Sequence, residues 1–312
     1  MLEENLGCPG GRNAGLRLML GPGDVDVVVE LDDDGLLIAD DVFARVQRLY
    51  AADPELGILS FRIADERGQT LRRHVPRLRD GDPLRRGPVT AFLGGGHALS
   101  APMLRQIGDW PGHFFFEHEE TDLAWRALDA GWEILYEPDL VLQHPRTPPE
   151  RHAVHYRMTA RNRVWLARRR MPAMLVPAYL GVWIAITVAR THSPAALRTW
   201  AAGFLEEVRT PCGPRQPMRW RTVWRMTRLG RPPLICPLQR SPTWDPLSWW
   251  ASRRAPWRWQ VQGPAGVTIA DRKAASDNRH SKDPLAEGQQ ERTSAFLLSW
   301  LSPSRDGNAP PE

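Results

Sequence analysis

A short apolar run that ends in three consecutive aspartates is the feature that most restricts how this chain can fold. Residues 25–31 (VDVVVEL) are rich in β-branched side chains and follow Gly23, which is typical of a buried strand. Carboxylates at the C-terminal end of such a strand lie where ligands bind in open α/β sheets. Asp32, Asp33 and Asp34 repel one another, and a hard divalent cation with oxygen ligands would relieve that repulsion. The alternative is a solvated acidic turn.

Strand and helix patterns alternate along residues 16–144. We expect an amphipathic helix at 40–52 and a loop rich in Arg, Asp, Gly and Pro at 62–88. Short strands are expected at 56–61, 92–99, 134–136 and 141–144. This alternation predicts an α/β fold with a largely parallel sheet. Three glycines inside one strand, Gly94, Gly95 and Gly96, indicate close approach by a ligand or another backbone.

Four carboxylates gather just before a second helical pattern: Glu117, Glu119, Glu120 and Asp122. The pattern itself places Leu123, Ala127 and Ala130 on one face, and Gly131 supplies a stop. Because the helix dipole favours carboxylates at a helix N-terminus, the acids could simply cap a surface helix. The functional interpretation is a carboxylate held as general base beside an incoming hydroxyl.

Residues 5–15 contain four glycines and two asparagines, which predicts a loop whose backbone amides approach a ligand closely. The segment matches neither a dinucleotide-binding nor a P-loop fingerprint, and a plain turn is the alternative. His97 could also be a ligand, although a histidine packed in the core is the preferred interpretation.

The 312 residues carry a net charge of +5, and their basic residues gather after position 146, which suits a membrane surface or a polyanion. Cys8, Cys212 and Cys236 have no metal-site spacing, which predicts a reducing compartment without disulfides. No signal peptide precedes the first motif, so we expect the catalytic part to be cytoplasmic.

These motifs occur in an order that resembles family 2 glycosyltransferases with a GT-A fold, and especially their galactofuranosyl- and rhamnosyltransferase-like members. The resemblance covers residues 5–172. It is carried by the 5–15 segment, the strand into Asp32, Asp33 and Asp34, the strand with three glycines, Glu119-Glu120 with Arg126 and Gly131, and Arg161-Asn162, which resembles the Arg-Asn that opens the family's C-terminal helical part.

The resemblance implies a Rossmann-like sheet with a site for a nucleotide-sugar donor. It assigns Asp32, Asp34 and His144 to a Mn²⁺ or Mg²⁺ ion, and it makes Glu120 the catalytic base with Glu119 as fallback. For His144 the alternative is a surface residue at a strand end. The implied donor-binding residues are Asn5, Gly7, Gly11, Asn13, Asp32, Asp33, Gly94, Gly95 and Gly96.

The implied activity is inverting transfer of a sugar from a UDP- or dTDP-sugar to a hydroxyl of a cell-envelope glycan or a lipid-linked acceptor. The family usually has a further unit, before the segment that matches 5–15, which holds the nucleotide base. We expect this chain to lack that unit, through a late start or a truncation, which leaves an exposed sheet edge and puts activity in doubt. The alternative function is a catalytically inactive fragment that acts as a membrane- or partner-binding module.

The second half combines a basic segment at 161–170 with an apolar one at 171–189, which Pro172 and Pro177 interrupt. We expect a helix lying on an anionic membrane, at the cytoplasmic face of a bacterial plasma membrane, rather than a full crossing. A buried core helix is the alternative. Tryptophans at headgroup level are expected to be Trp165, Trp183 and Trp200.

Arginines and tryptophans around 215–231 could suggest nucleic acid, but no nucleic-acid fold signature supports it. The expected organisation is therefore a partial catalytic domain at 1–160, a helical membrane-associated region at 161–235, and a disordered tail at 236–312.

Overall fold

The computed structural model describes residues 3–21, 23–78, 81–146, 155–209 and 213–234, together with the backbone of the short strand β7 (Phe296–Leu298). These residues belong to one compact unit, and a second unit, Gln239–Arg292, lies outside the described residues. The predicted disordered tail also lies outside them, apart from β7. The boundaries expected at 160 and 235, between the catalytic domain, the membrane-associated region and the tail, stay a prediction.

Seven strands form one sheet in the order β2-β6-β3-β5-β1-β7, and β4 also pairs with β6. The longer strands are β1 (Val27–Leu31), β3 (Leu56–Ala64), β5 (Gly96–Ser100) and β6 (Glu133–Gln143), whereas β2 (Leu36–Leu37) and β4 (Gly87–Pro88) are short. The two strands predicted at 134–136 and 141–144 are one strand, β6, with an irregularity in its pairing with β3.

The prediction of a largely parallel sheet is wrong, because the sheet is mixed and the pairing of β3 with β6 is its one parallel ladder among the described strands. β5 lies between β1 and β3 and runs against both. A parallel crossover needs a dozen or more residues and usually a helix. The described residues between β3 and β5 instead form a 3-10 turn (Arg72–His74) and β4. β1, β3 and β6 still run in one direction, so their C-terminal ends meet at the same edge.

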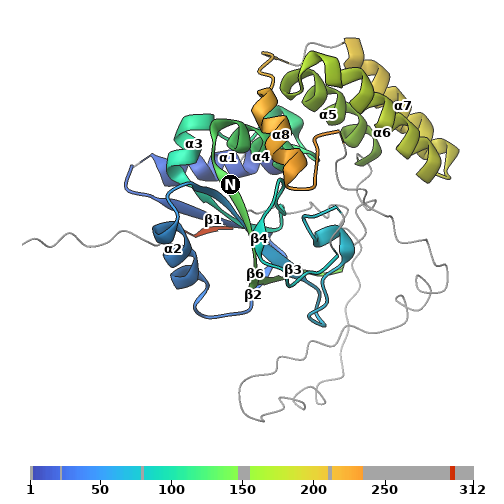
Figure 1. Ribbon diagram of the computed structural model, residues 1–312. Helices are drawn as coiled ribbons and strands as arrows, with labels where there is room; N and C mark the ends of the chain where they lie inside the picture. Colours follow the sequence, from blue (N-terminus) through green and yellow to red (C-terminus); the bar gives the residue numbers. More distant parts are fainter. Residues whose placement is uncertain are drawn as a thin grey trace, which may run out of the picture. The chain divides into compact units, whose positions relative to one another are not determined.

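Helices cover both faces of this sheet (Figure 1). On one face lie α1 (Gly7–Leu20), α3 (Ala101–Ile107) and α4 (Glu119–Ala130), and on the other lies α2 (Val42–Ala52), where a helix is predicted. Neighbouring residues of β1 supply the two cores, because successive side chains of a strand point to opposite faces. Val28 packs in the core under α1, α3 and α4, and Val29 packs in the core under α2. β7 pairs with the outer side of β1, the edge that is predicted to be exposed.

The glycine-rich segment predicted as a ligand-binding loop is mostly helix α1. Pro9 lies in the first turn, where a missing N–H removes no helical hydrogen bond, and Leu16 is fully buried. Two of the glycines serve close packing: a Cβ at Gly7 would collide with the carbonyl of Phe115, and a Cβ at Gly10 would collide with Leu6. Tertiary packing therefore outweighs the weak helix propensity of glycine.

The second half contains α5 (His155–Arg170), a 3-10 turn (Ala173–Leu175), α6 (Val176–Arg190), α7 (Pro194–Arg209) and α8 (Trp220–Arg228). α7 packs along α5, and Arg157 of α5 donates to both carboxylate oxygens of Glu206 on α7 at 2.8 Å. Pro177 lies in the first turn of α6, so it does not interrupt this helix as expected.

The arginines and tryptophans expected at a membrane surface are in part buried inside the protein. Trp183 and Trp200 are each 6% exposed, and Arg163 of α5 is 5% exposed. Arg163 stacks over the ring of Trp183, 3.5 Å from its centroid, and Arg170 pairs with the buried Asp122 of α4. These side chains therefore do not reach a lipid headgroup, because they have partners within the fold.

Candidate active site

Three predicted metal ligands lie together at the edge where β1 and β6 end. Asp32 and Asp34 follow β1, His144 follows β6, and one ligand atom from each lies within 4.8 Å of the others. His144 Nε2 is 3.0 Å from an Asp34 carboxylate oxygen and 3.7 Å from one of Asp32. Asp33, predicted to contact the donor, is exposed and lies outside this cluster.

The cluster fits a divalent cation by its own geometry. The Nδ1 atom of His144 donates to the carbonyl of Pro145 at 2.8 Å, so Nε2 is the ring nitrogen that faces the aspartates. An imidazole lone pair and a carboxylate oxygen only 3.0 Å apart need a cation or a proton between them. Two carboxylates with one imidazole are a donor set that suits Mn²⁺ or Mg²⁺.

The two glycines that precede β5 let this cluster approach α4. A Cβ at Gly95 would lie 3.2 Å from an Asp32 carboxylate oxygen and 3.7 Å from the His144 ring. A Cβ at Gly94 would collide with the Glu120 carboxylate. The third glycine, Gly96, packs against Leu142 and is the first residue of β5. The carboxylates of Glu120 and Asp32 therefore both lie close to the Gly94–Gly95 backbone, which carries no side chains.

The four acids before and within α4 have different surroundings, which the sequence does not reveal. Asp122 is fully buried between Arg126 and Arg170, and Glu117 lies 3.0 Å from His155 Nδ1. These two acids hold the fold. Glu119 is 3% exposed, and its Oε2 has no hydrogen-bond partner in the part of the chain that the structure describes.

Glu120 is half-buried and faces the site. Burial raises its pKa from 4.5 to about 7, although the positive charge of Arg12 opposes that rise. Burial also raises the pKa of Glu119, and the charge of Glu120 adds to that effect. A carboxylate with a pKa near 7 is suited to accept a proton at neutral pH. Of the two adjacent acids, Glu120 is the one with access to the edge of the sheet.

Arg12 is a site residue that the sequence motifs did not single out. It is 3% exposed, and its Nη2 donates to Asp32 at 3.0 Å and to the carbonyl of Gly94 at 2.8 Å. Its guanidinium also stacks on Trp110 and lies 3.7 Å from Glu30. Arg12 therefore fixes the Asp32 carboxylate and the Gly94 backbone together.

A buried polar network formed by Glu30, His97 and Trp110 lies against Arg12. Glu30 accepts from Trp110 Nε1 at 3.2 Å and lies 3.0 Å from His97 Nε2. His97 is fully buried, as expected for a core histidine, and its Nδ1 lies 3.2 Å from the Leu93 carbonyl. The network joins residues up to 80 positions apart, which is why no local pattern indicates it.

Strained backbone leads into α4, and α5 holds it. Phe115, Glu117 and His118 have φ values of 65°, 74° and 69°, and each such non-glycine residue costs of order 1–3 kcal/mol. The Nδ2 atom of the fully buried Asn162 lies 2.7–2.9 Å from three carbonyls of this loop, those of Phe114, Phe116 and Glu117, and its two hydrogens are shared among them. Asn162, matched at first only by resemblance, thus holds the loop that presents Glu120.

The asparagines predicted to bind the donor have partners within the fold. Asn13 exchanges two hydrogen bonds of 2.9 Å with the backbone of Trp110, and Asn5 accepts from the N–H of Gly7. Gly11 has open space where a Cβ would lie. Assignment of these residues to donor binding stays a prediction.

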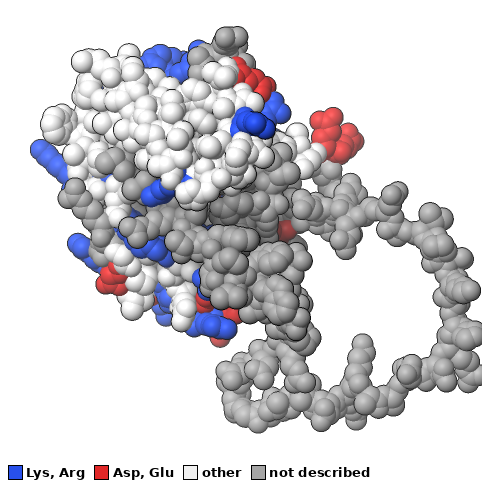
Figure 2. Space-filling view, turned by 90° about the vertical axis from the view of Figure 1, so that its right-hand side faces the viewer, with Lys and Arg blue, Asp and Glu red and all other residues white. Residues whose placement is uncertain are grey.

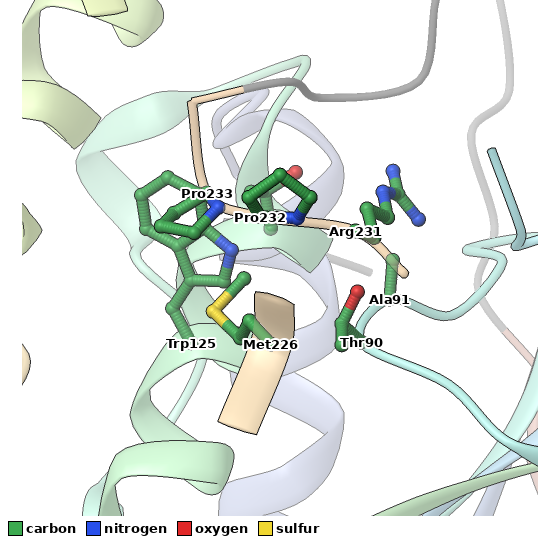
Figure 3. Close-up of a pocket in the computed structure, with 8 residues that line it drawn as sticks. Thr90, Ala91, Trp125, Met226, Arg231, Pro232 and Pro233 are labelled. Atoms are coloured by element: carbon green, nitrogen blue, oxygen red, sulfur yellow. The ribbon is translucent and has the colours of Figure 1, made fainter. Parts of the chain in front are cut away.

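A small hollow is lined by residues that do not belong to the metal cluster (Figure 3). Its lining includes Trp125, Met226, Pro232 and Pro233, with Thr90 on one side. Its cavity volume of about 10 Å³ is far below the ~300–1,000 Å³ of typical ligand pockets. We therefore place the candidate site at the sheet edge.

Fold and site together define an α/β protein with a mixed sheet and an acidic cluster at the C-terminal ends of its parallel strands. No protein-family model matches the chain, and no curated protein matches it. Among solved structures, the chain is similar to the glycosyltransferase GalNAc-T7 with UDP, GalNAc and Mn²⁺, at 13% identity and a TM-score of 0.43. It is also similar to the mannosyltransferase PcManGT from Pyrobaculum calidifontis with GDP-Man and Mn²⁺, at 19% identity and a TM-score of 0.37.

Each alignment covers 69% of this chain. The chain spans 46% of the GalNAc-T7 chain and 63% of the PcManGT chain, less than two thirds of either. The case for a function comes from the geometry of the site.

Proposed function

We propose that the chain is a metal-dependent inverting glycosyltransferase, which moves a sugar from a nucleoside-diphosphate sugar to a hydroxyl of a cell-envelope glycan or glycolipid. One observation carries the proposal. The Asp32–Asp34–His144 cluster lies next to Glu120, and the side-chain-free backbone of Gly94 and Gly95 lies between them. The arrangement places a cation site on one side of the Gly94–Gly95 backbone and a proton acceptor, Glu120, on the other.

Asp32, Asp34 and His144 would hold a Mn²⁺ or Mg²⁺ ion. When bound, the ion would neutralise the negative charge that grows on the departing diphosphate. Arg12 keeps Asp32 fixed through its 3.0 Å hydrogen bond, so the cluster needs little rearrangement to accept the ion. Arg12 is thus a positioning residue.

Glu120 takes the role of general base. Its carboxylate accepts the proton of the acceptor hydroxyl as the hydroxyl oxygen bonds to the anomeric carbon. The bond from that carbon to the diphosphate oxygen breaks on the opposite face, and its electron pair leaves with the nucleoside diphosphate. The pKa near 7, caused by burial, makes proton transfer efficient at neutral pH. Glu119 is the fallback base, one residue away but more deeply buried.

A donor-binding and transfer experiment tests the proposal. Calorimetry with a panel of UDP- and dTDP-sugars, in the presence and absence of Mn²⁺, should identify a donor that binds only with the metal. Asp34→Ala should lose that binding, whereas Glu120→Gln should keep it and lose transfer to the acceptor. Failure of every donor to bind with Mn²⁺ or Mg²⁺ would contradict the proposal and favour an inactive binding module. Full transfer by Glu120→Gln would move the base to Glu119.

A further inference from the structure

The outward face of α6 and the turn before it is entirely apolar. Ten residues between Ala173 and Ala189 are exposed, and each of them is Ala, Gly, Val, Ile, Met or Pro: Ala173, Met174, Pro177, Ala178, Gly181, Val182, Ile184, Ala185, Val188 and Ala189. Most of these positions follow the three- and four-residue spacing of one helical face. Met174 is 81% exposed and Val188 is 59% exposed. An apolar surface of this length on one helix indicates a partner that excludes water.

The opposite face of α6 shows how firmly the helix is held by the protein. Tyr179 and Trp183 are its buried residues, and they pack towards α5. Residues Ala173–Arg190 form the one described helical segment that is long and apolar enough to cross a membrane, and only 11% of it is buried. The alternative of a buried core helix is therefore inconsistent with the observed exposure.

Charge favours an anionic bilayer over other apolar partners. Three arginines of α5, Arg163, Arg169 and Arg170, are buried, and Arg157 pairs with Glu206, so the basic surface beside α6 comes from other arginines. Arg190 ends α6, and the exposed Arg198 lies on the next helix. Figure 2, seen from the side of α5, α6 and α7 in Figure 1, shows a broad surface without charged side chains and with both basic and acidic ones at its margins. Apolar surface bordered by arginines is typical of helices that lie in the interface of anionic membranes.

The packing of α6 also decides how it meets the bilayer. Arg163 of α5 is 5% exposed, stacks on Trp183 of α6 and lies 3.4 Å from the hydroxyl of Tyr179. A full crossing by α6 would carry this arginine and the rest of α5 into the hydrocarbon, where a charge is costly. A helix lying in the plane of the interface immerses only its apolar face, about 5–10 Å deep.

We infer that the face of α6 formed by the ten exposed residues docks the protein on an anionic lipid bilayer, with the helix axis parallel to the surface. The inference is independent of the transfer reaction, because it uses no residue of the metal cluster or of Glu120. It replaces two of the predicted tryptophan anchors, the buried Trp183 and Trp200, with the apolar face of α6 itself, and the role of the half-buried Trp165 stays a prediction. The predicted location at the cytoplasmic face of a bacterial plasma membrane stays a prediction.

Flotation of the full chain with lipid vesicles tests this inference. The probes are vesicles of phosphatidylcholine alone and of phosphatidylcholine with phosphatidylglycerol at a ratio of about 7:3, an anionic surface of the kind that attracts basic segments. The protein should float with the anionic vesicles, bind less at high salt, and be released by a carbonate wash. The double variant Val182→Glu with Val188→Glu should bind at least about tenfold more weakly, because burying one valine side chain is worth roughly that factor.

Leu18→Glu is the matched control. Leu18 is 81% exposed on α1, so the variant adds the same charge to an exposed apolar position elsewhere and should float like the parent. Circular dichroism checks that each variant folds. Retention after the carbonate wash overturns the surface arrangement in favour of a crossing. Unchanged flotation of the double variant, or no flotation of the parent, overturns the inference. So does a stable dimer without vesicles that the double variant converts to monomer, because a second copy then covers the face.

Discussion

Replacement of Glu120 by glutamine should make the folded protein more stable at pH 8 while it abolishes transfer. In the folded protein, burial raises the pKa of Glu120 from its ordinary 4.5 to about 7. Below pH 4.5 the carboxyl is protonated in both folded and unfolded chains, so it costs nothing. Between pH 4.5 and pH 7 the unfolded chain releases the proton and the folded chain keeps it, so stability falls as pH rises. Above pH 7 both states are ionised and the loss stays constant.

The size of the effect follows from the two pKa values. They differ by 2.5, and each pKa unit corresponds to about 1.4 kcal/mol, so the wild-type chain should lose about 3 kcal/mol between pH 4.5 and pH 8 relative to Glu120→Gln. Burial and, second, the charge of Glu120 raise the pKa of Glu119. Glu120→Gln removes that charge, so ionised Glu119 destabilises the fold less, which further increases the stability of the variant relative to wild type at high pH.

Urea unfolding at both pH values, read by circular dichroism, measures this difference directly. Glu55→Gln is the matched control for the loss of one carboxylate, because Glu55 is exposed and lies just before β3, at the opposite end of that strand from the metal cluster. A stability difference between Glu120→Gln and wild type that is the same at pH 4.5 and pH 8 would refute the reasoning, because Glu120 would then not be held in a desolvated site.

Three further changes test other contacts of the site. Asn162→Ala should destabilise the fold by about 3 kcal/mol, because buried loop carbonyls lose their donor; equal stability of variant and wild type in urea would show that α5 does not hold the loop. Asp34→Asn should weaken Mn²⁺ binding at least about tenfold in calorimetry, and unchanged affinity would remove Asp34 from the metal site. Gly94→Ala should cut transfer about 100-fold, as expected for a displacement of about 1 Å. Gly81→Ala is the control, because Gly81 is exposed and a Cβ there makes only ordinary contacts; wild-type transfer by Gly94→Ala would contradict the close approach of Glu120.

The family resemblance assigns Asp32, Asp34 and His144 to one cation, and the structure brings the three together at strand ends. A buried strand before Asp32 and another before His144 are local patterns, and both strands run in the same direction in the sheet. The direction of β5 could not be read in the same way, because strand composition does not encode orientation and the connection before β5 contains no described α-helix.

Other parts of the site depend on contacts that local patterns do not contain. Local sequence predicts a loop around Arg12, because glycine and proline lower helix propensity. The segment is helical because Leu16 and Arg12 are buried against the rest of the fold, which stabilises α1. Asn162 lies 45 to 48 positions from the carbonyls that it holds. The separate surroundings of Asp122 and Glu120, two residues apart, likewise depend on distant segments, because Arg170 pairs with Asp122 and the charge of Arg12 acts on Glu120.

The dependence of the transfer rate on pH, measured with saturating Mn²⁺ and donor, tests the central claim most directly. If Glu120 is the base beside the Asp32–Asp34–His144 cluster, the rate should rise with pH and level off above the pKa of this carboxyl, which burial raises from its ordinary value. Glu120→Gln should show no such rise at any pH, and Glu119→Gln should keep it. A pH profile that Glu120→Gln leaves unchanged would contradict the assignment of the base and with it the proposed site.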